Sequence, residues 1–422
     1  MKQPLVYKFG GASIKDATAI KRIAQLLKTR WTNNLVIVVS AAGKTTDRLE
    51  NLISLSFEGA AYDVPLLDLL DYHLDLCKGL FKDDHSIFAR VENHFAHLHR
   101  SLQDPAIKEN KDFFYDQIIG YGELISTRIF QEYLCELNCP CLWQDARELV
   151  STDSHTKMAK VDWALTMQHC RKVLIPKLEK FPVITQGFIG KDLQGNTTTL
   201  GREGSDFTAA IMGVSLGASS VTIWKDVAGI LNGDPDLFPD AVKFEYLDFE
   251  EAAEMTYYGA RVIHPKTIKP LSKHGIPLYV KSFLNPEASG TVIGAYGQAP
   301  RIPITIVKNK LSLIELRIRD LSMLGGFHFD YIYDVAGEIN AQIQLVQAAA
   351  AHISIVVNEL PFDNEQIIKA FRDIFQVKIE NSLKLVTIKN PTRAEIDHYR
   401  KLDEDLVLEN KSPGLIQWLF KV

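Results

Sequence analysis

Short, unbroken runs of apolar residues alternate with segments of helical periodicity along the first part of the chain. Residues 5–7 and 35–39 are continuous apolar runs, and between them Ile20, Ile23 and Leu27 recur at helical spacing. Continuous strands separated by helices are typical of a parallel sheet covered on both faces. Further strands are expected at residues 141–143, 183–187, 220–224 and 277–282. The pattern therefore predicts an α/β fold with a parallel-rich sheet sandwiched by helices.

The pattern changes near residue 298. From there the expected elements are short strands at 303–308, 311–318, 341–346 and 352–357, with helices at 323–335 and 364–375. This order predicts a small α+β domain. Strands at 383–388 and 414–420 then flank a charged helix at 392–401. This segment indicates an incomplete second copy of the strand–helix unit of the small domain. We expect three regions, at 1–297, 298–376 and 377–422.

Composition narrows the class of protein. The chain has 422 residues, of which 46% are hydrophobic and 23% charged, as in globular enzymes of two or three domains. A net charge of −5 does not favour a nucleic-acid or anionic-membrane partner, and no apolar run reaches membrane-spanning length. The five cysteines show no metal-binding spacing, no acidic or Cys partner completes a site with His94 and His97, and no leader is recognised. These features predict a cytoplasmic protein without a protein-bound metal.

The first strand ends in a glycine turn that carries a lysine, with the sequence Lys-Phe-Gly-Gly-Ala-Ser at residues 8–13. Ser13 is expected to cap the following helix. Free backbone N–H groups at a helix N-terminus bind phosphate, and Lys8 adds a full positive charge. Because Lys8 precedes the glycines, this is not the Walker pattern. An ordinary tight turn with a surface lysine is the alternative at this point.

Three later segments carry further candidate chemistry. Ser40 and Thr46 lie in a small-residue turn before a helix. Glu123 follows a glycine at a helix start, where it either caps the helix or binds a ligand ammonium. The guanidinium group of Arg202 can bind a carboxylate or phosphate through two hydrogen bonds. Asp206 is either a residue favoured by the helix dipole or one that orients a catalytic lysine.

Together these motifs resemble the aspartate kinases, within the wider amino acid kinase family. Residues 8–13 are similar to the family's Lys-Phe-Gly-Gly-Thr-Ser, 40–47 to Ser-Ala-x-Gly-x-x-Thr, and 122–123 to its Gly-Glu pair. Residues 201–206 resemble Gly-Arg-Gly-Gly-Ser-Asp, 226–235 resemble Thr-Asp-Val-Asp-Gly-Ile…Asp-Pro, and 259–265 resemble Gly-Ala-Lys-Val-Leu-His-Pro. Each motif is weak alone, but six in the right order between residues 5 and about 292 are highly specific.

The resemblance implies an amino acid kinase fold and ATP-dependent phosphorylation of L-aspartate to 4-phospho-L-aspartate, the first step of lysine, threonine and methionine synthesis. Mg²⁺ would be bound by the nucleotide phosphates. Lys8 would meet the transferring phosphoryl group, and Asp206 would orient Lys8. The residues implied at the aspartate site are Ser40, Thr46, Glu123, Arg202 and Ser205. The residues implied at the nucleotide, besides Lys8, are Gly10, Gly11, Ser13, Lys225, Asp226, Asp234 and Arg261.

The chain departs from the family pattern at several of these motifs. Ala12 stands at a Thr position, Glu203 at a Gly position, Lys225 at a Thr position and Asp236 at an Arg position. Arg261 replaces a Lys, which preserves the charge but not the geometry. These changes place a negative charge beside the site and move positive charge within the nucleotide pocket.

Residues 323–327 resemble the start of an ACT regulatory domain. The polar residues that would bind an inhibitory amino acid are largely absent at 340–342 and 347–351, so feedback inhibition by lysine or threonine is not supported residue by residue. The second ACT-like unit is truncated. Since paired ACT sheets usually pack across a dimer, the resemblance implies a homodimer or higher homo-oligomer formed through this region.

Two other functions stay open. One is another amino acid kinase, of the glutamate type, although Glu123 with Arg202 suits a free α-amino acid. The other is a non-catalytic, ACT-bearing regulatory subunit, suggested by the departures but opposed by the intact Lys8 and Asp206. A carboxylate acceptor is already ionised at pH 7, so no general base is needed, which agrees with the absence of an obvious catalytic histidine.

Overall fold

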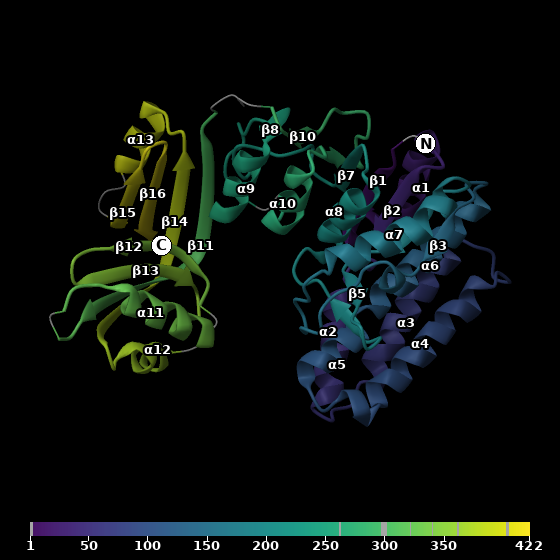
Figure 1. Cartoon of the computed structure of the whole chain (residues 1–422), viewed down its shortest axis with the longest axis horizontal. Helices are drawn as coiled ribbons and strands as arrows, with labels where there is room; N and C mark the ends of the chain where they lie inside the picture. Colours follow the sequence, from purple (N-terminus) through teal and green to yellow (C-terminus); the bar gives the residue numbers. More distant parts are fainter. Residues whose placement is uncertain are drawn as a thin grey trace. The chain divides into compact units, whose positions relative to one another are not determined.

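The computed structural model describes residues 3–260, 263–296, 302–320, 322–339, 341–360, 363–401 and 405–422. These residues form two compact units (Figure 1). The first unit is drawn from Met1–Ile230, Lys243–Ala253 and Val262–Ala299. The second is drawn from Leu231–Val242, Glu254–Arg261 and Pro300–Val422. Within the described residues, no helix combines the length and apolar character needed to cross a membrane.

An eight-stranded sheet forms the centre of the first unit, in the order β3-β4-β2-β1-β7-β9-β10-β8. All neighbouring strands from β3 to β9 are parallel, β10 is antiparallel to β9, and β10 is parallel to β8. The strands are β1 (Leu5–Phe9), β2 (Leu35–Val39), β3 (Leu142–Gln144), β4 (Val183–Gln186), β7 (Ser220–Lys225), β8 (Tyr246–Asp248), β9 (Leu278–Ser282) and β10 (Thr291–Gly294). A separate hairpin pairs β5 (Ile189–Lys191) with β6 (Thr197–Thr199). The parallel-rich sheet predicted from the apolar runs is confirmed.

Helices cover both faces of this sheet. One apolar cluster joins α1 and α6 to side chains of β1, β2 and β4, and on the opposite face α8 packs against β1, β2 and β7 and is flanked by α7 and α10. The α-helices are α1 (Ala17–Thr29), α2 (Thr45–Phe57), α3 (Asp63–Lys78), α4 (Ile87–Gln103), α5 (Lys111–Ile119), α6 (Tyr121–Glu136), α7 (Trp163–Leu178), α8 (Gly204–Leu216), α9 (Phe249–Tyr258) and α10 (Pro265–Lys273). The short 3-10 helices are η1 (Gly11–Ile14), η2 (Pro105–Ile107) and η3 (Ala146–Glu148).

The predicted cap of the first helix is wrong by three residues. Asp16, not Ser13, is the N-cap of α1, and its carboxylate accepts a hydrogen bond from Ala19 N at 2.7 Å. Ser13 instead lies in η1 and is buried. The 3-10 helix η1, which begins at Gly11, separates Gly10 from α1, whereas the sequence pattern placed the glycines directly before that helix.

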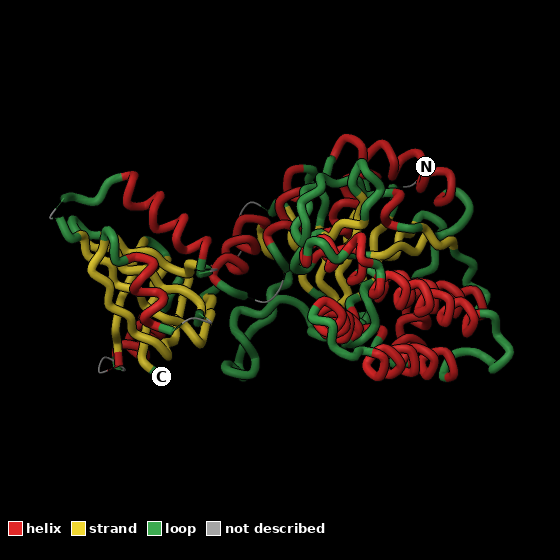
Figure 2. Tube along the Cα trace, turned by 90° about the horizontal axis from the view of Figure 1, so that it is seen from below, coloured by secondary structure: helices red, strands yellow, loops and turns green. Residues whose placement is uncertain are grey.

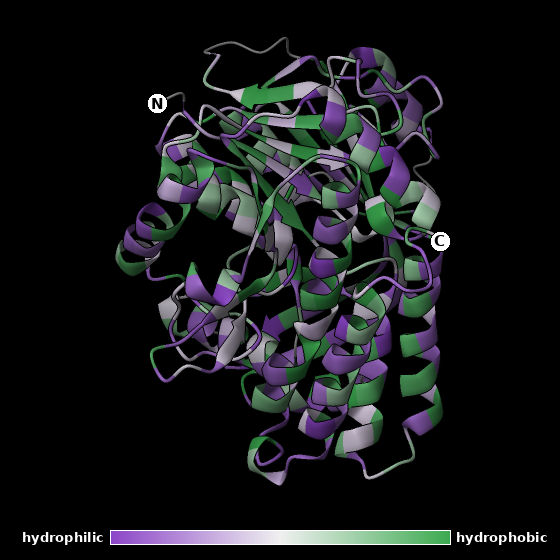
Figure 3. Cartoon of the chain, turned by 90° about the vertical axis from the view of Figure 1, so that its right-hand side faces the viewer, coloured by the Kyte–Doolittle hydropathy of each residue, from purple (hydrophilic) through white to green (hydrophobic). Residues whose placement is uncertain are grey.

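A second apolar core lies within a helical layer made of α2 to α6. Leu52 of α2, Leu69 of α3, Phe95 of α4, Phe114 of α5 and Ile125 of α6 belong to one cluster of buried side chains. Figure 3 shows the resulting pattern, with hydrophobic strands at the centre and helices whose surfaces alternate between hydrophobic and hydrophilic positions. Three helices of this layer, α2, α5 and α6, each contribute residues to the candidate active site described below.

The second unit is built on a six-stranded antiparallel sheet in the order β12-β13-β11-β14-β16-β15. Figure 2 shows its strands in yellow and its helices in red. The strands are β11 (Ile304–Ile318), β12 (Ile343–Ala348), β13 (His352–Asn358), β14 (Phe375–Lys389), β15 (Leu406–Ser412) and β16 (Leu415–Lys421), and the helices are α11 (Gly326–Glu338), α12 (Asn364–Phe371) and α13 (Arg393–Arg400). The predicted α+β region is therefore confirmed.

Two long strands run through both halves of this second sheet. Residues 311–318 of β11 pair with β13 and with the start of β14, whereas residues 304–308 pair with the end of β14. The two strands predicted at 303–308 and 311–318 are thus one strand, irregular near Lys310, whose φ is +58°. The expected boundary at 376/377 falls within β14, and that at 297/298 lies outside the described residues. The division into domains stays a prediction.

Candidate active site

The carboxyl ends of four neighbouring parallel strands lie level at one edge of the eight-stranded sheet. Phe9, the last residue of β1, pairs with Val39 of β2 and with Trp224 of β7, and Val39 pairs with Gln186 of β4. Ser40, directly after β2, donates its backbone N–H to Phe9 O at 3.1 Å. Loops that follow parallel strands meet at such an edge, which is where ligands bind in open α/β sheets.

Glycines bring the turns after β1 and β2 into main-chain contact. A Cβ on Gly11 would lie 2.6 Å from Ala41 O and 2.9 Å from Gly43 O, so a side chain at Gly11 would push the two turns apart. Gly43 N also donates to Gly11 O at 3.1 Å. A Cβ on Gly10 would lie 3.3 Å from Lys8 Nζ, so the Lys8 side chain folds back over its own turn.

Two lysines share one buried carboxylate at this edge. Lys8 Nζ lies 2.6 Å from Oδ1 of Asp206, and Lys225 Nζ lies 3.8 Å from Oδ2 of the same residue. Lys8 is 9% exposed and Asp206 is 3% exposed. Asp206 lies in the first turn of α8, where the helix dipole favours a negative charge. The carboxylate thus holds both ammonium groups near each other, and the three side chains together carry one net positive charge.

Glu123 is a buried carboxyl group in the first turn of α6. Its Oε1 accepts a hydrogen bond from Ala41 N at 3.3 Å, while its Oε2 has no hydrogen-bond partner among the described residues. Burial raises the pKa of Glu123 to about 8, although the Ala41 amide and the Lys8 ammonium act in the opposite direction. Glu123 does not cap the helix, so the capping alternative is wrong. The oxygen that has no partner is a ready acceptor for a ligand cation.

The loop before α8 and the first turn of that helix place Arg202, Glu203 and Ser205 at the same edge. Arg202 is exposed, and Ser205 is buried against Gly187, where a Cβ would come within 2.4 Å of Ser205. Glu203 is the N-cap of α8 in the left-handed region, with φ +53°. Its Oε2 accepts a hydrogen bond from His264 N at 2.9 Å. The extra acidic side chain noted in the sequence is therefore bonded to the turn before α10.

A cleft of about 620 Å³ collects these groups. Its lining residues include eight that the sequence singled out, namely Lys8, Ser40, Thr46, Glu123, Arg202, Ser205, Asp206 and Lys225. The remaining lining residues are Glu50, Tyr115, Lys157, Met158, Phe188, Gly201, Glu203 and Gly204. The volume suits a small organic ligand.

The other implied nucleotide residues are not among those that line this cleft. Gly10, Gly11 and Ser13 belong to the turn that follows Lys8, and Asp226 is exposed just beyond β7. Asp234 belongs to a segment of the second unit, where its Oδ1 accepts a hydrogen bond from Asp236 N at 3.0 Å. Arg261 lies outside the described residues. Their roles at a nucleotide stay predictions.

Sequence reasoning missed the wall of the cleft that comes from α2, α5 and nearby loops. Tyr115 of α5 donates its hydroxyl to Glu50 of α2 at 3.1 Å, and Lys157 Nζ lies 5.1 Å from the centre of the Tyr115 ring. No local motif marks these residues, because only the packing of α5 brings them to the sheet edge. Phe188 was detectable, since it follows Gly187 at the end of a predicted strand in a third glycine turn.

A buried aspartate beneath this wall fixes the position of Lys157. Asp116 Oδ2 accepts a hydrogen bond from Lys157 N at 3.0 Å, and its Oδ1 accepts one from Thr199 Oγ1 at 2.7 Å. Burial raises the pKa of Asp116 to about 6 in spite of these hydrogen bonds. Lys157 is held with φ +60°, an uncommon backbone conformation for a residue with a side chain. The hydrogen bond that Lys157 N donates to Asp116 offsets that strain.

Metal ligands are not clustered in the part of the chain that the structure describes. Within it, no group of three or more His, Cys, Asp or Glu side chains is arranged to hold a metal ion. His97 is exposed on α4, and His94 is partly buried. The chemical groups gathered at the cleft are cations, hydroxyls and backbone amides, together with the carboxyl groups of Glu50, Glu123, Glu203 and Asp206.

Comparisons with known proteins identify the family of the chain. Residues 3–282 match the amino acid kinase family. Aspartokinase 2 of Arabidopsis thaliana, a chloroplastic protein, is 30% identical over 402 residues, which cover 93% of this chain and 73% of the relative. The structure of E. coli aspartokinase III in complex with aspartate and ADP has a TM-score of 0.84 and 26% identity, covering 99% of this chain and 96% of that chain. The form of the same enzyme with lysine and aspartate gives a TM-score of 0.82 at 26% identity, with the same coverage. The chain belongs to the aspartokinases of the amino acid kinase family.

Proposed function

We propose that the cleft transfers the γ-phosphoryl group of ATP to the side-chain carboxylate of L-aspartate. A carboxylate oxygen forms a bond to the γ-phosphorus, the bond from phosphorus to the β–γ bridging oxygen breaks, and ADP leaves beside 4-phospho-L-aspartate. The observation that carries the proposal is the union, in one cleft, of the Lys8–Asp206 pair with the carboxyl group of Glu123 and the exposed Arg202. The relative solved with aspartate and ADP supports this choice of substrates.

The main chemical problem is bringing two anions together. Lys8 and Lys225 supply positive charge beside the shared Asp206, and helices α2 and α8 both begin at the cleft, where their N-terminal dipoles favour anions. Catalysis then rests on alignment and on preorganised positive charge at the transferring group. Asp206 orients Lys8 through the 2.6 Å contact, so the ammonium need not reorganise during transfer.

The aspartate side of the cleft suits a free α-amino acid. Glu123 offers its partnerless Oε2 to the substrate ammonium, and Arg202 has the planar donor pair that a carboxylate binds. Ser40, Thr46 and Ser205 line the same cleft and supply hydroxyl donors. An acylated amino acid has no ammonium to neutralise Glu123, so it would leave the buried oxygen without a partner.

On the nucleotide side we retain the implied roles of Gly10, Gly11 and Ser13 toward the phosphates. We also retain the implied nucleotide-binding roles of Lys225, Asp226, Asp234 and Arg261. The short 3-10 helix after Gly10 presents backbone N–H groups, as phosphate-binding turns do. Mg²⁺ would be bound through the nucleotide phosphates, where it would neutralise charge on the β- and γ-oxygens. The described residues offer no separate acidic cluster for it.

A general base is not required for this reaction. The acceptor is a side-chain carboxylate with an ordinary pKa near 4, so it is already a nucleophile at pH 7. A glutamate-type kinase would use the same chemistry, and its longer substrate would need a deeper pocket between Glu123 and Lys8. The non-catalytic alternative is opposed by the intact Lys8–Asp206 pair.

The second unit fits the role of an assembly and regulatory region. We retain the proposals of a homodimer or higher homo-oligomer formed through its ACT-like sheet, and of a cytoplasmic location. The six-stranded sheet carries α11 and α12 on one half and α13 on the other, each half with its own apolar cluster. Aspartokinase III of E. coli has been solved with lysine, a property of that protein.

Trapping the acyl phosphate tests the proposal. The purified chain is mixed with Mg-ATP and hydroxylamine, and L-aspartate, L-glutamate or N-acetyl-L-glutamate is added in turn. Formation of aspartyl hydroxamate, with one ADP released for each hydroxamate, is the expected result. A glutamyl product instead would favour the glutamate-type kinase. Absence of product with every substrate would favour the regulatory subunit.

A further inference from the structure

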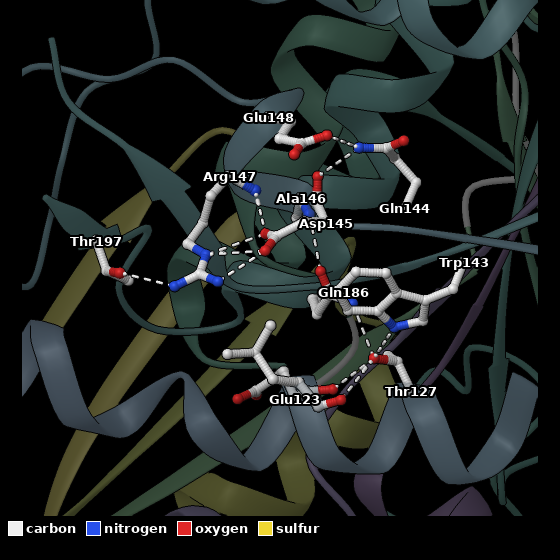
Figure 4. Close-up of polar contacts among 11 residues, drawn as sticks. Glu123, Thr127, Trp143, Gln144, Asp145, Ala146, Arg147, Glu148, Gln186 and Thr197 are labelled. Carbon is white, nitrogen blue, oxygen red and sulfur yellow. Dashed lines mark hydrogen bonds and ion pairs between the residues drawn. The ribbon is translucent and has the colours of Figure 1, made fainter. Parts of the chain in front are cut away.

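A buried hydroxyl group lies where helix α6 meets the ends of strands β3 and β4. Thr127, one turn after Glu123 in α6, has no exposed surface. Trp143 Nε1 of β3 and Gln186 Nε2 of β4 donate hydrogen bonds to Thr127 Oγ1 at 2.9 and 2.8 Å. The hydroxyl itself donates to the carbonyl oxygen of Glu123 at 2.8 Å (Figure 4).

This hydroxyl uses its full hydrogen-bonding capacity. A threonine hydroxyl has one donor and two acceptor positions, and here the two acceptor positions receive Trp143 and Gln186 while the donor points to Glu123. A threonine in a helix often bonds only to the carbonyl one turn back, which is a local contact. The Thr127 hydroxyl makes this local contact and also accepts hydrogen bonds from side chains of β3 and β4. It therefore connects the first turn of α6 to the sheet.

The two partners of Thr127 are themselves held in place. Gln186 is fully buried, and its Oε1 accepts a hydrogen bond from Ala146 N of η3 at 2.8 Å. The Trp143 ring lies under the guanidinium of Arg128, whose carbon is 3.6 Å from the ring centre. Figure 4 shows Trp143 and Gln186 meeting at Thr127 beside Glu123. The network therefore fixes Thr127 from η3, β3 and β4.

The side chain of Glu123, by contrast, is weakly held. Its Oε1 accepts a long hydrogen bond of 3.3 Å from Ala41 N, and its Oε2 is without a partner among the described residues. The position of the carboxyl group is therefore set mainly by the main chain of the first turn of α6. That main chain is the part of the helix to which Thr127 is bonded.

We infer that Thr127 is a positioning residue for substrate binding, because its hydroxyl locks the α6 turn that aims Glu123 at the ammonium of the amino acid. The inference rests on the proposed function for the role of Glu123. It assigns Trp143 and Gln186 to the same task, since each supplies one of the hydrogen bonds that fix the Thr127 hydroxyl. Binding of the nucleotide should not depend on this network.

Steady-state kinetics of T127V test the inference. Valine keeps the shape and the branched side chain but removes the hydroxyl, so the KM for aspartate should rise about 10- to 100-fold while the KM for ATP stays within about twofold. T127S restores the hydroxyl and should recover most of the affinity. The matched control is T166V, because Thr166 of α7 is equally buried, accepts from Ser151 N at 3.0 Å and does not line the cleft.

A double-mutant cycle with Glu123→Gln separates failure of the inference from failure of the proposed function. If E123Q leaves the KM for aspartate unchanged, the role of Glu123 in the proposed function is wrong. If E123Q raises that KM but T127V does not, or if T166V raises it equally, the inference is overturned. When both act through one carboxyl group, T127V adds less than about twofold in the E123Q background.

Two milder variants cover the case in which T127V does not fold. W143F removes one donor and keeps an aromatic ring beside Arg128, and Q186M removes the other at similar volume. Each should raise the KM for aspartate severalfold and leave the KM for ATP unchanged. An equal rise in both KM values, or none in either, would contradict a positioning role.

Discussion

The ammonium of Lys8, on β1, lies 2.6 Å from Oδ1 of Asp206, on α8. The pair joins the first strand of the chain to the helix that begins far downstream, and it lies within the cleft. Lys8→Met removes the charge and should lower kcat about 10²- to 10³-fold, the usual cost of removing one preorganised donor. Initial rates at saturating ATP and aspartate measure the effect. Lys281→Met is the control, since Lys281 is a partly buried strand lysine that does not line the cleft.

Asp206→Asn should impair the same step by a different route. The amide keeps the shape of the side chain but no longer neutralises Lys8, so the ammonium loses its fixed position. We expect a fall in kcat that does not add to that of Lys8→Met in the double variant, because both changes disable one unit. Fully additive losses would show that the two residues act independently.

The raised pKa of Glu123, about 8, predicts a pH dependence of aspartate binding. Below that pH the carboxyl group is mostly neutral in the free protein, whereas the substrate ammonium requires the ionised form. The KM for aspartate should therefore fall as the pH rises toward 8, by at most about tenfold per pH unit, and then level off. Binding at pH 7 should also release a proton, measurable by calorimetry in two buffers. A pH-independent KM between 6 and 8 would refute the assignment, and E123Q should abolish the slope.

Glu203 has a positive φ of +53° and a hydrogen bond from His264 N, which act on stability in opposite directions. Glu203→Gly removes the hydrogen bond and also the backbone strain, whereas Glu203→Ala removes only the hydrogen bond. The glycine variant should therefore be more stable than the alanine variant by about 1 kcal/mol. Denaturant unfolding of the two proteins measures the difference. The reverse order would mean that the loop changes its conformation on substitution.

Lys225 lies 3.8 Å from Asp206 and lines the cleft, so it should assist binding of the anionic nucleotide. Lys225→Met should lower kcat/KM for ATP about tenfold, while Lys225→Arg, which keeps the charge, should lose much less. Added salt should reduce the difference between the methionine variant and the parent protein, because it screens a partly exposed charge. The same kcat/KM for ATP in Lys225→Met and Lys225→Arg would exclude a role for this charge.

The apolar runs predict the central sheet well, because strands buried on both faces have few polar positions. Strands that contain several polar residues were missed, because they lack the long apolar run that marks a fully buried strand. The β5–β6 hairpin ends in Thr197–Thr199, and in β15 the short apolar run at 406–408 is followed at once by Glu409, Asn410 and Lys411. The continuity of β11 was also hidden, because Lys308 and Lys310 interrupt its apolar pattern where the strand passes between the two halves of the sheet.

The site was predictable to the extent that its chemistry lies in local motifs. Lys8, Glu123, Arg202 and Asp206 each lie beside glycines at the end of a strand or the start of a helix, and the structure brings all four into one cleft. Thr127 carries no such signal, because its importance comes from the strands that meet it. Side chains that position a site through tertiary contacts can be identified from the three-dimensional structure, but not from their spacing along the sequence.

The most direct test of the account is single-turnover transfer of the γ-phosphoryl group of [γ-³²P]ATP, with the parent protein, Lys8→Met and Lys281→Met compared side by side. We expect labelled 4-phosphoaspartate to form only when L-aspartate is present, at a similar rate in the parent and Lys281→Met, and about 10²- to 10³-fold more slowly in Lys8→Met. An unchanged transfer rate in Lys8→Met, or transfer that does not require aspartate, would contradict the assignment of this cleft.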